Sequence, residues 1–110
     1  MTAPFVTGLR TSDDEAIVIA AAGEGPMLHL RVQQAELWET VRVDATGTVA
    51  VAAVKLAALA EFYPDGFAAD DFVVKVRGFE ILREGDSLVA SGVRDGSTLL
   101  LTSRRRRPVR

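Results

Sequence analysis

The sequence has 110 residues, of which 48% are apolar and 25% are charged, values typical of one globular domain. It contains no cysteine and one histidine, which excludes disulfide frameworks, thiol nucleophiles, thiolate metal sites and multi-histidine metal sites. Residues 1–103 carry eight basic and fifteen acidic residues, a net charge of about −7, whereas five arginines give residues 104–110 a charge of +5. We therefore expect an acidic body with a basic tail.

The sequence offers no sign of a membrane segment or of a catalytic site. No apolar run reaches the roughly 20 residues of a membrane span. The N-terminus lacks the basic start of a secretion signal, so we expect a cytoplasmic protein without membrane contact. The carboxylates show no spacing typical of a metal loop or an acid–base pair, and no glycine-rich phosphate loop is present. We therefore expect no metal, no cofactor and no enzymatic activity.

Residues 1–26 form an N-terminal leader that either adds an extra strand or stays flexible. It contains an acidic cluster, Asp13–Glu15, and an apolar run, Ala16–Ala22. Three placements are open for the apolar run: against a helix, at a sheet edge, or against a partner. We favour a cover from within the chain, because exposed apolar clusters usually mark a contact.

Residues 27–103 have the pattern of a folded domain. Apolar and polar residues alternate over 27–33 and again over 40–44, which predicts two strands, and the short break between them is typical of a hairpin. We expect Trp38 to pack near this hairpin. His29 faces outward from the first strand, and without a neighbouring nucleophile it is expected to be a solvated side chain.

The run Val49–Tyr63 has no internal glycine or proline and predicts a helix that Thr46–Thr48 caps and Pro64–Gly66 ends. On a 3.6-residue wheel, the face expected to be inside comprises Val49, Ala52, Ala53, Leu56, Leu59, Ala60 and Tyr63. The opposite face comprises Val51, Val54, Ala58 and Phe62, with Lys55 and Glu61 as its charges. This second face would be exposed if nothing covered it, and an exposed apolar cluster usually marks a contact, so it is the surface that the leader's apolar run or a partner is expected to cover.

The C-terminal half predicts three further strands. Alternation over 72–77 indicates the first, Gly78 breaks it, and residues 79–82 form a short second one. Leu88 and Val93 are expected to pin an irregular turn to the core, before the last strand at Thr98–Ser103. This order of elements predicts an α+β domain in which a mixed sheet wraps on one helix.

Three stretches resemble a known family. Val76–Leu82 resembles ubiquitin's strand, glycine turn and short strand, and Glu84–Leu88 resembles its acidic-glycine turn. Gly92–Leu101 resembles the approach to its last strand. Over residues 27–107 the chain is therefore similar to ubiquitin, which implies a ubiquitin-like β-grasp fold. The resemblance implies no single function, because β-grasp domains serve many roles.

The tail differs from that of ubiquitin at the C-terminal Gly-Gly, the part of ubiquitin that is activated for conjugation. Arg104 and Arg106 match arginines of ubiquitin's tail, but Arg107 and Pro108 stand where the resemblance places Gly-Gly. A bulky side chain and a fixed φ do not fit a tunnel built for two glycines. Conjugation would therefore need a different activating enzyme or trimming of the tail.

The resemblance also places ubiquitin's apolar recognition patch on Ala35, Lys75 and Thr102, with lysine at its centre. Partners that read that patch should not bind here. Our candidate surface patch comprises Val51, Val54, Ala58, Phe62, Lys75 and Leu100. Our candidate partner-binding tail comprises Arg104, Arg105, Arg106, Arg107 and Pro108. The planar fork of arginine suits carboxylate-lined clefts, so we expect the tail to dock to a protein.

We expect a non-enzymatic ubiquitin-like protein, and the high Ala, Val, Arg and Asp content with little Lys indicates a GC-rich bacterial genome. The favoured hypothesis is a protein modifier of a bacterial ubiquitination-like pathway, its tail docked to or processed by activating or conjugating enzymes or a peptidase. The alternative is a non-covalent adaptor, like that of type VII secretion systems, that binds a secretion component. Nucleic-acid contact through the tail is a weaker alternative, because five charges sit on an acidic body. The oligomeric state stays open.

Overall fold

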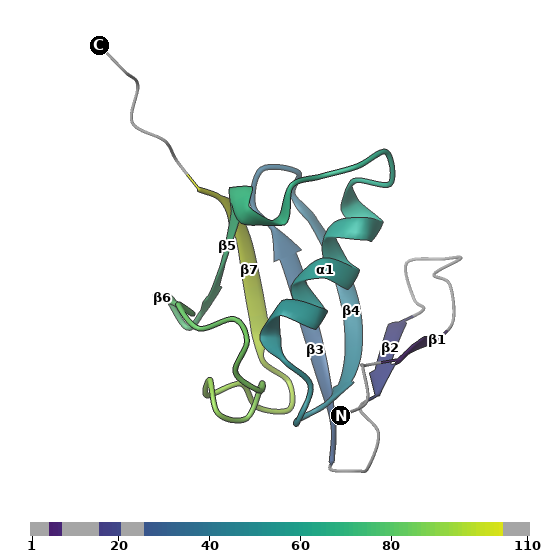
Figure 1. Ribbon diagram of the computed structural model, residues 1–110, viewed down its shortest axis with the longest axis vertical. Coiled ribbons are helices and arrows are strands. Elements are labelled where there is room, and N and C mark those ends of the chain that lie inside the picture. The colour runs from purple at the N-terminus through teal and green to yellow at the C-terminus, as the bar shows by residue number, and fades with distance from the viewer. Residues whose placement is uncertain (1–4, 8–15, 21–25, 105–110) are drawn as a thin grey trace.

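A computed structural model describes residues 5–7, 16–20 and 26–104 of the chain. In it, one helix lies against a seven-stranded mixed sheet (Figure 1). The strands are β1 (Phe5–Thr7), β2 (Ala16–Ala20), β3 (Met27–Gln34), β4 (Glu39–Thr46), β5 (Phe72–Val76), β6 (Phe79–Glu80) and β7 (Thr98–Ser103). The helix α1 spans Val51–Phe62, and one short 3₁₀ turn, η1, spans Ala69–Asp71.

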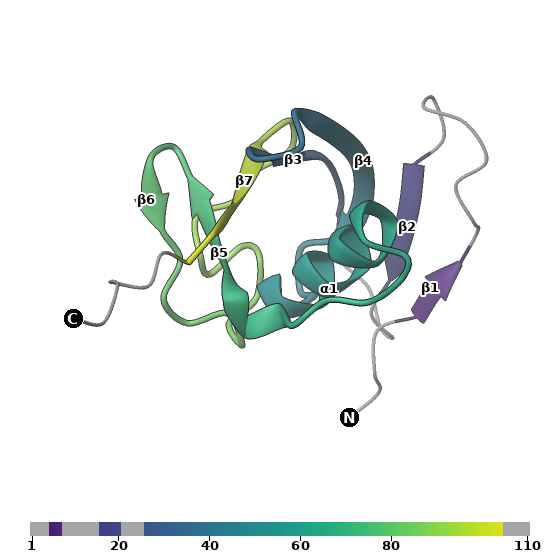
Figure 2. The same ribbon diagram turned by 90° about the horizontal axis from the view of Figure 1, so that it is seen from above.

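The sheet has the order β1-β2-β4-β3-β7-β5-β6. In its middle, β3 pairs antiparallel with β4 and parallel with β7, and β7 pairs antiparallel with β5. Figure 2 shows the sheet curved around α1. In β3, β4 and β7 the buried residues recur at every second position and are apolar except for Gln34 and Thr46 at strand ends, as a sheet with one buried face requires. The expected α+β fold with a mixed sheet on one helix is therefore confirmed.

The apolar run of the N-terminal segment provides a strand beside β4. β2 pairs parallel with β4 and antiparallel with β1. Ile17 and Ile19 are 3% and 0% exposed and belong to the same core as the helix. Their two-residue spacing places both side chains on one face of the strand. The strand thus covers the edge of β4 and adds two large side chains to the core.

The predicted faces of the helix were right only in part: Val49 and Leu59, expected inside, are buried, but the stripe expected outside is buried as well. Val51, Val54 and Ala58 are 0% exposed and Phe62 is 8% exposed, whereas Leu56, expected inside, is 47% exposed. Both stripes have the 3.6-residue period, so periodicity alone did not separate them. The buried stripe carries the larger side chains, and burying them removes more apolar area from water than burying alanines does.

The expected cap of the helix was also wrong. The N-cap residue is Ala50, which makes no side-chain capping bond. Instead, the backbone N–H groups of Val51 and Ala52 donate to the carbonyl oxygens of Asp86 and Glu84, at 2.9 and 2.7 Å. A remote turn of the chain therefore satisfies the first free donors of α1, which a threonine side chain was expected to do.

The segment between β6 and β7 is held to the core by apolar residues, as expected. Leu88 and Val93 are 0% and 3% exposed. The N–H of Leu88 donates to the carbonyl of Val49 at 2.9 Å, which ties the segment to the start of α1. These contacts fix the turn that caps the helix.

One charged side chain lies in the core. Lys55 is 3% exposed, and its Nζ donates to both carboxylate oxygens of Glu84, at 2.9 and 3.1 Å. Glu84 is 24% exposed. A buried charge is tolerated when it is paired and hydrogen-bonded, and this pair fastens α1 to the irregular segment.

Candidate functional site

The root of the tail is fixed at the end of β7. The N–H of Arg104 donates to the carbonyl of Asp71 at 2.6 Å, and its Nε donates to the carbonyl of Asp70 at 3.0 Å. These bonds fix Arg104 beside η1 at the end of β7, near the top of the coloured ribbon in Figure 1. The remaining predicted tail residues, Arg105, Arg106, Arg107 and Pro108, lie outside the described residues.

A glutamate of the β3–β4 hairpin holds the tail root from the other side. Glu36 accepts hydrogen bonds from the N–H of Ser103, at 3.2 and 3.3 Å, and from Oγ1 of Thr102 at 3.1 Å. Partial burial raises the pKa of Glu36, but the hydrogen bonds from Gln34, Ser103 and Thr102 together outweigh burial and leave the pKa below its usual range. The carboxylate form therefore fastens the hairpin to the end of β7.

A buried glutamine organises the same hairpin. Gln34 is 0% exposed, its Nε2 donates to Glu36 at 2.9 Å, and its Oε1 accepts from the N–H of Leu37 at 3.0 Å. A buried amide needs such partners, because an unpaired one would retain its full desolvation cost. The amide thus sets the position of Glu36 and the path of the turn together.

An open groove of about 600 Å³ lies beside the tail root. Tyr63, Phe67 and Phe72 line it with Arg104, and the rings of Tyr63 and Phe72 have centroids 5.4 Å apart. Burial raises the pKa of Tyr63, and the nearby negative charges of Glu36 and Glu39 raise it further. The groove, the hairpin and the tail root therefore lie at one end of the molecule.

Trp38 does not pack near the hairpin as expected. It is 88% exposed, and its backbone has φ of 58°. The hairpin loop spans residues 35–38 between the paired Gln34 and Glu39, and Trp38 N–H donates to the Gln34 carbonyl at 3.0 Å. Trp38, the last residue of this loop, takes a left-handed conformation that glycine or asparagine usually adopts. Residues 35–38 contain no glycine, so the sequence gives no local signal for this left-handed position.

The arrangement of sheet and helix matches solved structures. The ubiquitin of Caldiarchaeum subterraneum superposes with a TM-score of 0.62 at 17% identity, covering 76% of this chain and 100% of that protein. The C-terminal ubiquitin-like domain of mouse tubulin-specific chaperone e gives 0.64 at 14% identity, covering 81% and 98%. The chain has the ubiquitin-like β-grasp fold. No protein-family model and no curated protein sequence matches it.

The candidate surface patch on this ubiquitin-like domain is corrected by the burial of its helix residues. Val51, Val54, Ala58 and Phe62 belong to the core, so no partner reaches them without unfolding the helix. The other two members, Lys75 and Leu100, are brought together, because they face each other across β5 and β7. Both are half-buried on the outer face of the sheet. The patch is thus reduced to its sheet residues.

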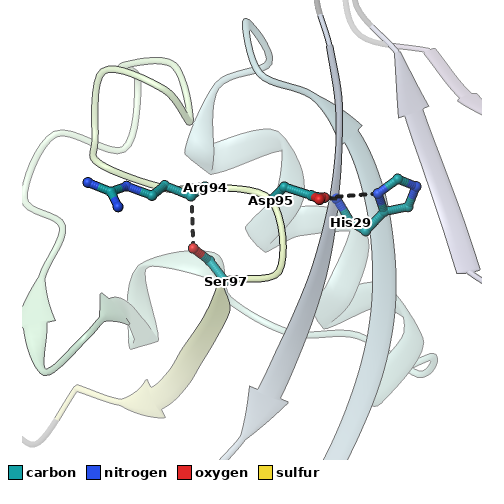
Figure 3. A network of polar contacts seen from close by, with 4 residues as sticks. All are labelled: His29, Arg94, Asp95 and Ser97. Carbon is teal, nitrogen blue, oxygen red and sulfur yellow. Dashed lines mark hydrogen bonds and ion pairs between the residues drawn. The ribbon is translucent and has the colours of Figure 1, made fainter.

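His29 has a structural role in the ubiquitin-like fold. Its N–H donates to Oδ1 of Asp95 at 2.8 Å, and its Nδ1 lies 2.9 Å from the same oxygen (Figure 3). In the same turn, Arg94 N–H donates to Oγ of Ser97 at 2.9 Å. The hydrogen bond from the His29 backbone is the main cause that holds the pKa of Asp95 below its usual range. These contacts tie the turn before β7 to β3.

Two negative findings hold for the part of the chain that the structure describes. In residues 5–7, 16–20 and 26–104, no helix is long and apolar enough to cross a membrane. Across those same ranges, the acidic side chains and His29 form no group of three that could hold a metal ion.

Proposed function

We propose that this protein is a cytoplasmic ubiquitin-like modifier of a bacterial ubiquitination-like pathway, and that activating or conjugating enzymes or a peptidase dock to or process its tail. The observation that supports it is the fixed position of the tail root, Ser103 and Arg104. Arg104 follows β7 directly and is bonded to η1, while Glu36 holds Ser103. A ubiquitin-like domain thereby presents a basic extension at the position where ubiquitin keeps its reactive end.

The opposite charges of the folded body and the tail orient the protein as it approaches a partner. Residues 1–103 carry about −7 and residues 104–110 carry +5. A carboxylate-lined cleft repels the body and attracts the arginines, because opposite charges steer encounter and like charges oppose it. Such a cleft therefore admits the protein tail first, which is the orientation that processing or activation of a C-terminus requires.

One observation favours a second function. Arg107 and Pro108 stand at the positions that match the Gly-Gly of ubiquitin, and their bulk does not suit a narrow tunnel. A non-covalent adaptor of the type VII secretion kind needs no reactive end. It would bind a secretion component through the folded domain, with the tail as an accessory contact.

Mass spectrometry separates these functions. The full chain, carrying an N-terminal tag, is expressed in its own host together with the genes that flank it, and its mass and attached proteins are determined. For a modifier we expect a trimmed C-terminus and isopeptide-linked products, which disappear when residues 105–110 are deleted. The matched control is the double variant Arg77→Ala/Arg94→Ala, which removes two exposed arginines outside the tail and should leave conjugation unchanged.

Intact, unattached protein under these conditions would contradict the modifier function. An adaptor keeps its partner after deletion of the tail, because the folded domain makes the main contact. Nucleic-acid binding would instead give a gel shift that weakens steeply with salt and is lost with the tail.

A further inference from the structure

The outer face of the sheet, which points away from α1, carries three cationic side chains. Arg31 on β3, Arg42 on β4 and Lys75 on β5 each stand between two buried neighbours, so all three point outward. Figure 2 shows this face as the convex side of the curved sheet. Three of the eight basic residues among residues 1–103 therefore share one face of an acidic body.

The helix layer on the other side of the sheet is acidic. Residues 51–71, which include α1 and η1, contain four carboxylates and a single basic residue, Lys55. Lys55 is buried and paired with Glu84, so it contributes little positive charge to that surface. The body thus has an acidic helix layer and an outer sheet face whose centre is basic.

Two of the three cations are placed where they repel each other. Arg31 and Arg42 stand directly opposite across the antiparallel pair of β3 and β4. Like charges in this position lower the stability of a sheet. Within residues 5–7, 16–20 and 26–104, neither Arg31 nor Lys75 forms an ion pair or a side-chain hydrogen bond. An anionic ligand bound over this face would relieve the repulsion.

Two half-buried side chains fill the space between Arg31 and Lys75. Gln33 follows Arg31 on the same face of β3, Leu100 lies beside Gln33 on β7, and Lys75 lies beside Leu100 on β5. Neighbouring strands are about 4.8 Å apart, so the row from Arg42 to Lys75 is roughly 15 Å long. A segment of about five extended residues covers that length. Such a segment meets a cation at each end and an apolar side chain at Leu100.

The margins of the face restrict what binds there. Asp44 lies opposite His29 on β4, and Glu80 lies opposite Lys75 on the edge strand β6, so an acidic segment follows the row between these carboxylates. In the described ranges, no phenylalanine, tyrosine or tryptophan points outward from β3, β4, β5 or β7. The face therefore lacks the rings on which single-stranded nucleic acids stack, which favours a protein segment as the occupant.

We infer that Arg31, Arg42 and Lys75, with Gln33 and Leu100 between them, form a docking surface for an acidic protein segment that carries one apolar side chain. The guanidinium forks of the two arginines bind carboxylates, and Lys75 binds a further one as a point charge. The apolar side chain packs on Leu100. The inference does not depend on the proposed function, because this surface includes neither the tail nor the tail root.

Photo-crosslinking in the host cell tests the surface and its occupant. The photoreactive residue p-benzoylphenylalanine is introduced into the full chain at positions 40 and 98, two exposed threonines that pair with Gln33 and Arg31 and leave the proposed contacts intact. Position 56 is the control, because Leu56 is 47% exposed on α1. Mass spectrometry should identify one Asp- and Glu-rich segment of one protein at positions 40 and 98, and not at position 56.

Binding of the purified partner tests the role of charge. Arg31→Glu/Lys75→Glu should weaken binding by about tenfold or more, and the loss should be smaller at high salt. Arg83→Glu/Arg94→Glu is the matched control: it changes the net charge equally, at two exposed arginines between β6 and β7, and should weaken binding less than about threefold. Replacing the acidic residues of the partner's segment with lysine should restore binding to Arg31→Glu/Lys75→Glu.

Loss of folding should not obscure this comparison. Arg31→Glu places an opposite charge beside Arg42 and so removes a repulsion, and urea denaturation should show that Arg31→Glu/Lys75→Glu is folded.

Four outcomes overturn the inference: no crosslink from position 40 or 98, a crosslink to a segment without acidic residues or to nucleic acid, a crosslink to another part of this chain, or unchanged binding by Arg31→Glu/Lys75→Glu. The modifier function fails separately, if no conjugate forms. A crosslinked acidic segment without conjugates would support the docking surface and contradict the modifier function. Conjugates without that crosslink would do the reverse.

Discussion

At the residue scale, Trp38 is held in a conformation that costs stability. A non-glycine residue in the left-handed region costs about 1–2 kcal/mol of stability, which replacement by glycine removes. Part of that gain is lost again, because glycine has more conformational freedom in the unfolded chain. We expect Trp38→Gly to raise the free energy of unfolding by about 0.5–1 kcal/mol, measured by urea denaturation. Leu37→Gly is the control and should lower it, because φ of Leu37 is not positive. Destabilisation by Trp38→Gly would show that the indole packs within the chain.

The pH dependence of stability tests the Glu36 clamp. The folded state lowers the pKa of Glu36, so its contribution is complete above the unfolded pKa of about 4.5 and is lost as the pH falls through the folded pKa. We expect Glu36→Gln to be destabilising at about pH 7 and progressively less destabilising as the pH falls below about 4.5, because the native clamp is lost as Glu36 becomes protonated. Glu39→Gln, on the same hairpin, should show a smaller change over the same pH range. A Glu36→Gln effect that does not depend on pH would contradict the clamp.

The tail arginines were recognisable in the sequence, but the residues that position the tail were not. Arg104 belongs to a run of four arginines that composition alone reveals. Glu36 lies 66 and 67 residues from Thr102 and Ser103, and its role exists only because β3 and β7 are paired. Likewise, Gln34 looks like an ordinary polar residue at a strand end until its burial is known.

At the element scale, the observed face of α1 is open to a direct test. Val54→Ala should lower the free energy of unfolding by about 2 kcal/mol, because it removes two buried methyl groups and leaves a cavity. Leu56→Ala removes more atoms, yet it should cost less than about 1 kcal/mol, because Leu56 is 47% exposed and alanine favours helix. Urea denaturation of the two variants gives the order. The reverse order would restore the face predicted from the sequence.

The existence of the elements followed from local pattern, whereas their faces did not always do so. Alternation predicted the strands, since a half-buried sheet requires it. The helix was predicted at Val49–Tyr63 and spans Val51–Phe62, but a helix that is apolar on nearly all sides has no unique inner face by periodicity. Lys55 made the wrong assignment attractive, because a lysine normally points to solvent.

At the scale of the whole molecule, the Lys55–Glu84 pair joins the helix to the segment before β7. Glu84→Ala leaves a buried ammonium group without its partner, which should cost about 3 kcal/mol in the free energy of unfolding. Adding Lys55→Met should recover at least about half of that loss, because the buried charge is then removed. Glu80→Ala, at an exposed carboxylate, should change stability by less than about 0.5 kcal/mol.

The comparison is made by urea denaturation at about pH 7, the same for all variants. If the double variant is no more stable than Glu84→Ala, then Lys55 is not an uncompensated charge in the single variant. The pair would then be a surface contact of small energy.

The sequence by itself determined the fold class, the irregular turn pinned by Leu88 and Val93, and the segregation of charge into an acidic body and a basic tail, because periodicity and composition are local properties. The tertiary structure decided which side of α1 is buried, where the run at Ala16–Ala20 lies, and how Gln34 and Glu36 join the hairpin to the tail. Each of these depends on contacts between residues far apart in the chain. The sequence alone does not show that Glu36 and Ser103 are in contact, because they come together only when β3 pairs with β7.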